Sequence, residues 1–267
     1  MAGGVGAVTM DPRFSEKTYP RRDNVYKAKK SLDFDLLRTK VYQDRKKDWF
    51  TYLMEWFAYT LVGLFTGFTA AIMTNIEENS TIFRRNRTDD IIDHNNENVF
   101  WGYVFFTSLS ACFVLVSTCM TIFWGPGANG SGVAELIAYL NGVNYPNVFS
   151  FETFVTKTIG VVLAVVGGMC VGKEGPLAHI GAIVGVFVVY LPCPRFEFFR
   201  NDKNKRHFIA AGTSAGVSAA FGAPIGGALF AYEISKPNTF WKFSVIWKVF
   251  FSCAMAVFTL AIFNALL

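Results

Sequence analysis

Two apolar stretches of the sequence, residues 155–171 and 177–191, enclose the block Gly172-Lys173-Glu174-Gly175-Pro176. This position places Lys173 and Glu174 near the apolar interior of a bilayer, where an ionisable side chain is energetically costly and indicates a function. The glycines and the proline interrupt the helix, and irregular backbone at that depth is tolerated only inside protein or beside a wet cavity. A helix that restarts there presents free N–H groups and the positive end of its dipole. The block therefore predicts an anion site.

Glu174 differs from the rest of this block because its charge has the same sign as a bound anion. A carboxylate beside an anion-binding helix start competes with the anion for the same positive field. It can occupy the site when ionised and leave when protonated. The alternative, a Lys–Glu pair on a helix surface, fits poorly between two hydrophobic runs, so we expect Glu174 to act as a gate.

A second candidate anion site is the run Gly130-Ser131-Gly132-Val133-Ala134-Glu135, which opens the short apolar segment 136–140. A serine between two glycines at a helix start offers one hydroxyl donor and uncovered backbone N–H groups. Such weak neutral donors suit a partly dehydrated monovalent anion, because they bind it and still release it. An ordinary serine N-cap is the structural alternative, and the run by itself favours that interpretation.

The composition is that of an integral membrane protein. The 267 residues are 52% hydrophobic and only 17% charged, with a mean hydropathy of +0.32, whereas a soluble domain has about 25% charged residues. The net charge of +5 comes with a crowd of basic residues before the first apolar stretch, which places the N-terminus in the cytosol by the positive-inside rule. A nucleic-acid-binding arm is the alternative, and it is disfavoured because acidic and apolar residues interrupt the basic ones.

Hydropathy divides the chain into a cytosolic leader, residues 1–49, and a membrane region, residues 50–267. Residues 54–76 and 99–124 are long enough to cross a bilayer. The polar residues 77–97 between them predict a loop on the far side, where the sequons at Asn79 and Asn86 could be glycosylated.

The last apolar stretch, residues 241–267, runs to the final residue, so we expect an incomplete chain or an unusually early stop. Between residues 125 and 224, short apolar pieces alternate with Gly/Pro breaks, as in the broken helices of transport proteins. Glycines also recur four residues apart, a spacing that lets helix backbones approach closely in lipid. These pairs are Gly63 and Gly67, Gly168 and Gly172, Gly181 and Gly185, and Gly212 and Gly216.

Three blocks, taken in order, resemble signatures of the CLC family of chloride channels and chloride/proton exchangers. The run from Gly130 to Glu135 is similar to the family's GSGIPE, and GKEGP at 172–176 matches in full. Residues 210–230 are similar to its small-residue helix and FGAP turn. The likeness covers residues 50–267. It implies an all-α integral membrane bundle of tilted and broken helices, the first of two inverted repeats, with the second half and the CBS domains absent, and a homodimer when complete.

The resemblance also implies roles for individual residues. Glu174 is expected to be the gating glutamate and Ser131 a central chloride ligand, with a bearing on selectivity because nitrate-preferring relatives carry proline there. The expected chloride-binding residues are Gly130, Ser131, Gly132, Lys173, Gly175 and Pro176. Ala134 departs from the signature proline, which removes a preset φ angle from the first turn.

A second departure separates the family's two mechanisms. Exchangers of the family typically have two successive glutamates where this chain has Glu233 and Ile234. Because isoleucine cannot carry a proton, Ile234 favours a channel, with Glu233 as a possible substitute relay. We therefore expect a chloride-selective, voltage-gated channel that conducts passively. The alternatives are a chloride/proton exchanger and a truncated, non-conducting subunit that assembles with a full-length relative.

The sequence argues against an enzyme. GKEGP is not a Walker phosphate loop, which needs Gly-x-x-x-x-Gly-Lys followed by Ser or Thr. The histidines His94, His179 and His207 are far apart and lack metal spacing; His179 is expected to be a packed, hydrogen-bonded residue. The expected partners are chloride, membrane lipid and a second copy of the chain, with no cofactor, metal or nucleic acid. Which membrane houses the protein is left open.

Overall fold

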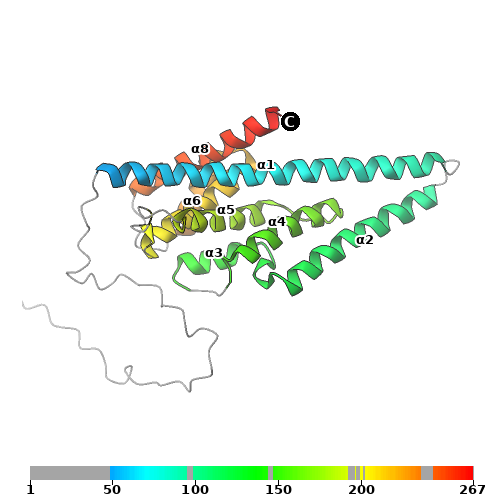
Figure 1. The fold of residues 1–267 in the computed structure, drawn as a ribbon, viewed down its shortest axis with the longest axis horizontal. Coiled ribbons are helices and arrows are strands. Elements are labelled where there is room, and N and C mark those ends of the chain that lie inside the picture. The colour runs from blue at the N-terminus through cyan, green and yellow to red at the C-terminus, as the bar shows by residue number, and fades with distance from the viewer. Residues whose placement is uncertain are drawn as a thin grey trace, which may run out of the picture. The chain divides into compact units, whose positions relative to one another are not determined.

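The computed structural model describes residues 49–94, 99–143, 147–191, 196, 199–200, 202–235 and 243–266. The expected leader therefore lies outside the described residues except for Trp49. In the described ranges the chain is all-helical (Figure 1). The helices are α1 (Trp49–His94), α2 (Val99–Phe123), α3 (Val133–Leu140), α4 (Phe151–Val166), α5 (Glu174–Val189), α6 (Asp202–Phe221), α7 (Pro224–Ser235) and α8 (Phe243–Leu266), with a 3₁₀ turn, η2, at Pro126–Ala128.

Within the described residues, α1, α2 and α8 are each long and apolar enough to cross a membrane. The span predicted at 99–124 is confirmed as α2, and the apolar stretch at 241–267 contains α8. The polar loop predicted at 77–97 is wrong, because α1 continues without a break to His94. No glycine or proline lies between residues 77 and 94 to end the helix. Both sequons consequently lie on α1 and not in a loop.

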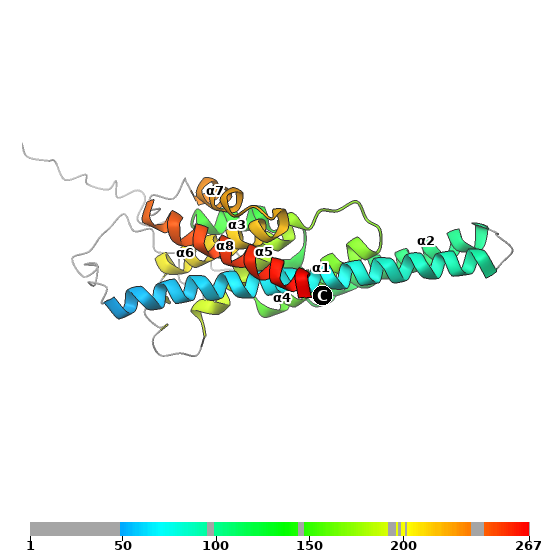
Figure 2. The same cartoon turned by 90° about the horizontal axis from the view of Figure 1, so that it is seen from above.

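Glycines bring helix backbones into contact at two crossings, as their spacing predicted. A methyl group on Gly63 or Gly67 of α1 would overlap a backbone carbonyl of α8, at Ser252 and Ala256 respectively. On α5, Gly181 faces Gly212 and Gly216 of α6 just as closely. Only a residue without a side chain permits such approach. The tight crossings join α1 to α8 and α5 to α6, and α8 lies beside α1 in both views (Figure 2).

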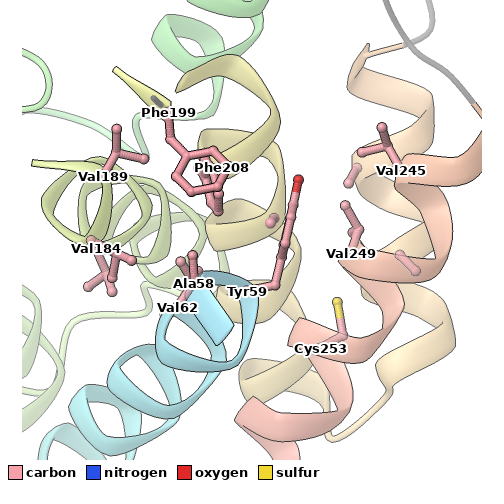
Figure 3. Close-up of a cluster of buried hydrophobic side chains, with 14 of the residues drawn as sticks. Ala58, Tyr59, Val62, Val184, Val189, Phe199, Phe208, Val245, Val249 and Cys253 are labelled. Atoms are coloured by element: carbon pink, nitrogen blue, oxygen red, sulfur yellow. The ribbon is translucent and has the colours of Figure 1, made fainter. Parts of the chain in front are cut away.

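The core ties these two pairs of helices together. Tyr59 of α1 stacks on Phe208 of α6 with ring centroids 4.7 Å apart. On its other side Tyr59 faces Val249 and Cys253 of α8 (Figure 3). A buried ion pair adds a polar link, since Lys248 Nζ of α8 lies 2.8 Å from Glu55 Oε2 of α1. This packing fixes α5, and with it the helix start that carries Glu174.

Candidate functional site

The structure brings the two sequence-predicted helix starts together. A Cβ atom built on Gly175, in the first turn of α5, would lie 2.8 Å from Ser131 Cβ and 3.7 Å from Ser131 Oγ, just ahead of α3. Each helix start leaves backbone N–H groups without an intrahelical partner and carries the positive end of a dipole. The starts of α3 and α5 therefore lie within contact distance of each other.

At the start of α3, glycines set the backbone. Gly132 is the N-cap residue, with φ 82°, and Gly130 is also left-handed, at φ 67°. Ser131 is therefore not the N-cap that the structural alternative assumed. Its Oγ accepts a long hydrogen bond, 3.4 Å, from the Val133 N–H. Since Oγ is the acceptor in that bond, its own hydrogen stays available to donate, and Ser131 is exposed.

At the start of α5, Glu174 is the first helical residue and Lys173 the N-cap, without a side-chain cap. Pro176 occupies the first turn, where the missing N–H costs nothing. The first intrahelical bond of this end runs from the Leu177 N–H to the Lys173 carbonyl, at 2.9 Å. The N–H groups of Glu174 and Gly175 therefore precede the hydrogen-bonded ladder and are the donors this helix offers.

The Glu174 side chain folds back toward the chain that precedes it. A methyl group on Gly172 would overlap the Glu174 carboxylate at Oε2. Gly172 thus makes room for the carboxylate, and Gly168 ends α4 at φ 81°. The prediction that these two glycines pack helices together is therefore wrong, because both lie in the linker between α4 and α5.

Lys173, one of the expected chloride-binding residues, points its ammonium elsewhere. Its Nζ lies 3.0 Å from Glu77 Oε2 on α1. Both side chains are largely buried, with 29% and 21% of their surfaces exposed. The charge of Lys173 is thus largely neutralised by a carboxylate from the first helix, and what this residue presents at the site is its backbone.

The site contains a cation that the sequence reasoning overlooked. Lys157 of α4 is buried, and its Nζ lies 2.8 Å from where a Cβ atom on Gly132 would sit. The same Nζ lies 2.6 Å from Nδ1 of His179 on α5, and His179 Nε2 lies 2.9 Å from the Val148 carbonyl. A carbonyl only accepts, so Nε2 carries a hydrogen and Nδ1 accepts from Lys157. His179 is hydrogen-bonded through both nitrogens, as predicted.

A clear signal could have revealed Lys157. It is the one lysine within the otherwise uncharged apolar run 153–171. The reasoning applied to Lys173 and Glu174, that an ionisable group at membrane depth is a functional candidate, applies equally to it. Its histidine partner could not be read from the sequence, because the two residues are 22 positions apart.

The two residues at the end of α7 have different surroundings. Ile234 is 8% exposed and belongs to an apolar cluster with Leu136 of α3 and Ala178 of α5. Glu233 is exposed. The residue without a titratable group therefore faces the interior beside the two helices that form the site, while the carboxylate faces away. Among the described residues, no three His, Cys, Asp or Glu side chains gather as a metal site.

Comparison with known proteins shows the family. A family model described as "Voltage gated chloride channel" matches residues 112–266. Proteins called "H(+)/Cl(-) exchange transporter 7" are similar to this chain: that of Mus musculus is 34% identical over 265 residues, 93% of this chain and 33% of its own length. That of Homo sapiens is 34% identical over 268 residues, 94% of this chain and 33% of its own. "Chloride channel protein CLC-a" of Arabidopsis thaliana is 34% identical over 250 residues, 87% of this chain and 31% of its own.

A solved structure, "Crystal Structure of a eukaryotic CLC transporter", matches the fold with a TM-score of 0.69. It is 22% identical and the match covers 78% of this chain and 38% of that one. At that identity the likeness concerns the fold alone. The chain spans about a third of the length of the curated relatives it matches.

Proposed function

The chain belongs to the voltage-gated chloride channel (CLC) family, and we propose that the full-length protein moves chloride across a membrane between the paired starts of α3 and α5. The observation that carries this proposal is the approach of Gly175 to Ser131, which brings two positive helix ends to one place. Residues 50–267 then form the first of two membrane repeats, residues 1–49 a cytosolic leader, and two copies a homodimer. A second half of the protein supplies the remaining walls of the pathway.

Within this site the residues have distinct parts. The Ser131 hydroxyl and the first N–H groups of α3 and α5 hold the anion. Gly130 and Gly132 supply the left-handed backbone that turns the chain into α3. Gly175 lets the two starts approach, and Pro176 lies in the first turn of α5, where its missing N–H removes no intrahelical bond. Lys173 contributes its backbone as the N-cap of α5.

Glu174 is the gate in this proposal. Its ionised carboxylate has the charge of the anion and lies at the same helix start, so it competes with chloride for the N–H groups of α5. Protonation removes the charge and with it the competition, which opens the pathway.

We propose passive conduction as the mode of transport. Coupled exchange needs a proton path to Glu174, and the interior position at the end of α7 is filled by Ile234, which cannot titrate. Proton-coupled exchange is the second candidate, favoured by the names of the relatives from Mus musculus and Homo sapiens. In that case Glu233, which is exposed, is the carboxylate nearest in sequence to the usual relay position.

The test is electrical recording from the full-length protein with Glu174→Ala. We expect an anion current that has lost most of its dependence on voltage and pH. Glu152→Ala is the matched control, since Glu152 is an exposed carboxylate in the first turn of α4, and its gating should stay as in the wild type. Wild-type gating in Glu174→Ala would remove Glu174 from the gate.

The mode of transport is tested in the wild-type protein by changing pH at a fixed chloride gradient. Passive conduction leaves the reversal potential where chloride alone sets it. A reproducible shift with pH would establish exchange instead, and its loss in Glu233→Gln would make Glu233 the relay.

A further inference from the structure

The α4–α5 linker, residues 167–173, leads into Glu174 and meets side chains of α1 at both ends. At the far end from Glu174, Gly168 lies against the guanidinium of Arg84: a Cβ atom on Gly168 would lie 3.2 Å from Nη1 and 3.6 Å from Nη2. At the near end, Lys173 Nζ lies 3.0 Å from Glu77 Oε2. Glu77 and Arg84 are seven residues apart on α1, about two helical turns, so both lie on one face of that helix.

Arg84 is itself fixed in place. Its side chain is buried, with the residue 8% exposed. Nη1 donates to Ser110 Oγ of α2 at 3.0 Å, and the guanidinium lies 4.3 Å from the centroid of the Phe106 ring. These contacts tie the Arg84 side chain of α1 to α2 and leave its guanidinium against Gly168 of the linker.

Arg84 also stands where a cation is favoured. The end of α4 closes with a Met169 N–H bond to the Ala164 carbonyl, 3.1 Å, and a Gly168 N–H bond to the Val165 carbonyl, 2.8 Å. This is the Schellman arrangement, with the left-handed glycine that it requires. The guanidinium thus sits against the negative end of α4. The middle of the linker, by contrast, is exposed from Met169 to Gly172.

The Glu77–Lys173 pair has a direct consequence for the gate. Lys173 is the neighbour of Glu174 in the chain, and its ammonium is the nearest positive side chain in sequence. While Glu77 holds that ammonium, it is not free to pair with the Glu174 carboxylate. Without Glu77, the Lys173 ammonium is free to pair with another carboxylate, and the ionised Glu174 is next to it in the chain.

We propose that Glu77 and Arg84 are positioning residues for the gate: α1 fixes both ends of the linker that carries Glu174, and Glu77 keeps the Lys173 ammonium away from the gating carboxylate. This inference rests on the proposed gating role of Glu174. The polar half of α1 thereby takes part in transport.

The experiment records the open-to-closed ratio and the opening rate at one voltage and one pH in the full-length protein. Glu77→Gln should slow opening about threefold, the effect of releasing one partly buried ion pair, while Glu77→Asp, which keeps the charge, should stay closer to the wild type. Arg84→Met should change the open-to-closed ratio, and Arg84→Lys, which keeps the positive charge, should give a ratio closer to that of the wild type. The matched controls are Glu78→Gln and Arg85→Met, whose side chains are exposed on the same helix.

A double-mutant cycle separates positioning from a general structural effect. In a Glu174→Ala background, Glu77→Gln and Arg84→Met should leave the remaining current unchanged, because both act through the carboxylate that is gone. If Glu174→Ala abolishes gating but Glu77→Gln and Arg84→Met gate as the wild type, this inference fails and the proposed gate stands. Persistent effects in the Glu174→Ala background would also overturn it. Wild-type gating in Glu174→Ala alone would instead contradict the proposed function.

Discussion

Replacing Lys157 by methionine tests whether a buried charge on α4 helps to hold the anion. Lys157 Nζ lies 2.8 Å from the Cβ position of Gly132, beside the start of α3. For an anion held by Ser131 and the α3 N–H groups we take a separation of roughly 8 Å from this ammonium, at which two unit charges interact by ~2 kcal/mol at an effective dielectric constant of 20. That energy corresponds to about thirtyfold in affinity. The negative charge of Glu135, which acts on Lys157, offsets part of this attraction for the anion.

We therefore expect Lys157→Met to weaken chloride binding about tenfold or more. The assay is the chloride concentration that gives half-maximal flux or conductance in the full-length protein, supported by calorimetric titration with chloride. Methionine is unbranched and apolar and of similar length, so it fills the buried position with little change in packing. Lys205→Met is the matched control, because its ammonium lies over the rings of Tyr139 and Tyr190 at the opposite end of α3.

Two outcomes would refute this reasoning. A half-saturating concentration within twofold of the wild type would mean that the Lys157 charge does not reach the anion. An equal loss in Lys205→Met would mean that overall charge, and not the position of Lys157, sets the affinity.

Two further substitutions test the geometry of the site. Gly175→Ala places a methyl group 2.8 Å from Ser131 Cβ, so the two helix starts must move apart by about 1 Å to restore ordinary contact. Chloride binding should weaken several-fold, at a strain of about 1–3 kcal/mol. The control Gly226→Ala, whose methyl meets only Ala223 Cβ at 3.5 Å, should bind chloride as the wild type does. Ser131→Pro removes the hydroxyl donor and should raise nitrate over chloride permeation in bi-ionic recordings; an unchanged permeability ratio would remove Ser131 from the selectivity site.

The breaks in the membrane helices could be predicted from the sequence, because glycine and proline act locally. A break between α4 and α5 is present as expected, at residues 167–173, although only Gly172 and Lys173 of the block lie in it and Glu174 to Pro176 open α5; the FGAP turn separates α6 from α7. The length of α1 could not be predicted from hydropathy. Hydropathy reports where a helix leaves the apolar layer, whereas a helix ends where its backbone bonds end, and residues 77–94 hold nothing that ends them.

The glycine pairs show a second limit of local reasoning. Spacing by four residues predicted helix packing correctly for Gly63 and Gly67 but wrongly for Gly168 and Gly172. The difference is backbone conformation: Gly168 has φ 81° and closes α4, so it cannot continue a packing stripe. The four-residue spacing indicates packing only if both glycines lie in one helix. It fails where one of the glycines ends that helix.

The two lysines of the site show why its electrostatics depend on tertiary contacts. Lys173 lies within the signature and was expected to attract the anion, yet a carboxylate 96 residues away, Glu77, neutralises it. Lys157 lies in the apolar run before the signature, and its hydrogen-bond partner is the neutral His179, which accepts through Nδ1 and leaves Glu135 to offset part of its charge. A paired charge has a weak field beyond its partner, whereas a charge on a neutral partner keeps its field. If the field of a lysine matters for binding, Lys157→Met should therefore cost more chloride affinity than Lys173→Met, the reverse of the order that the signature alone predicts.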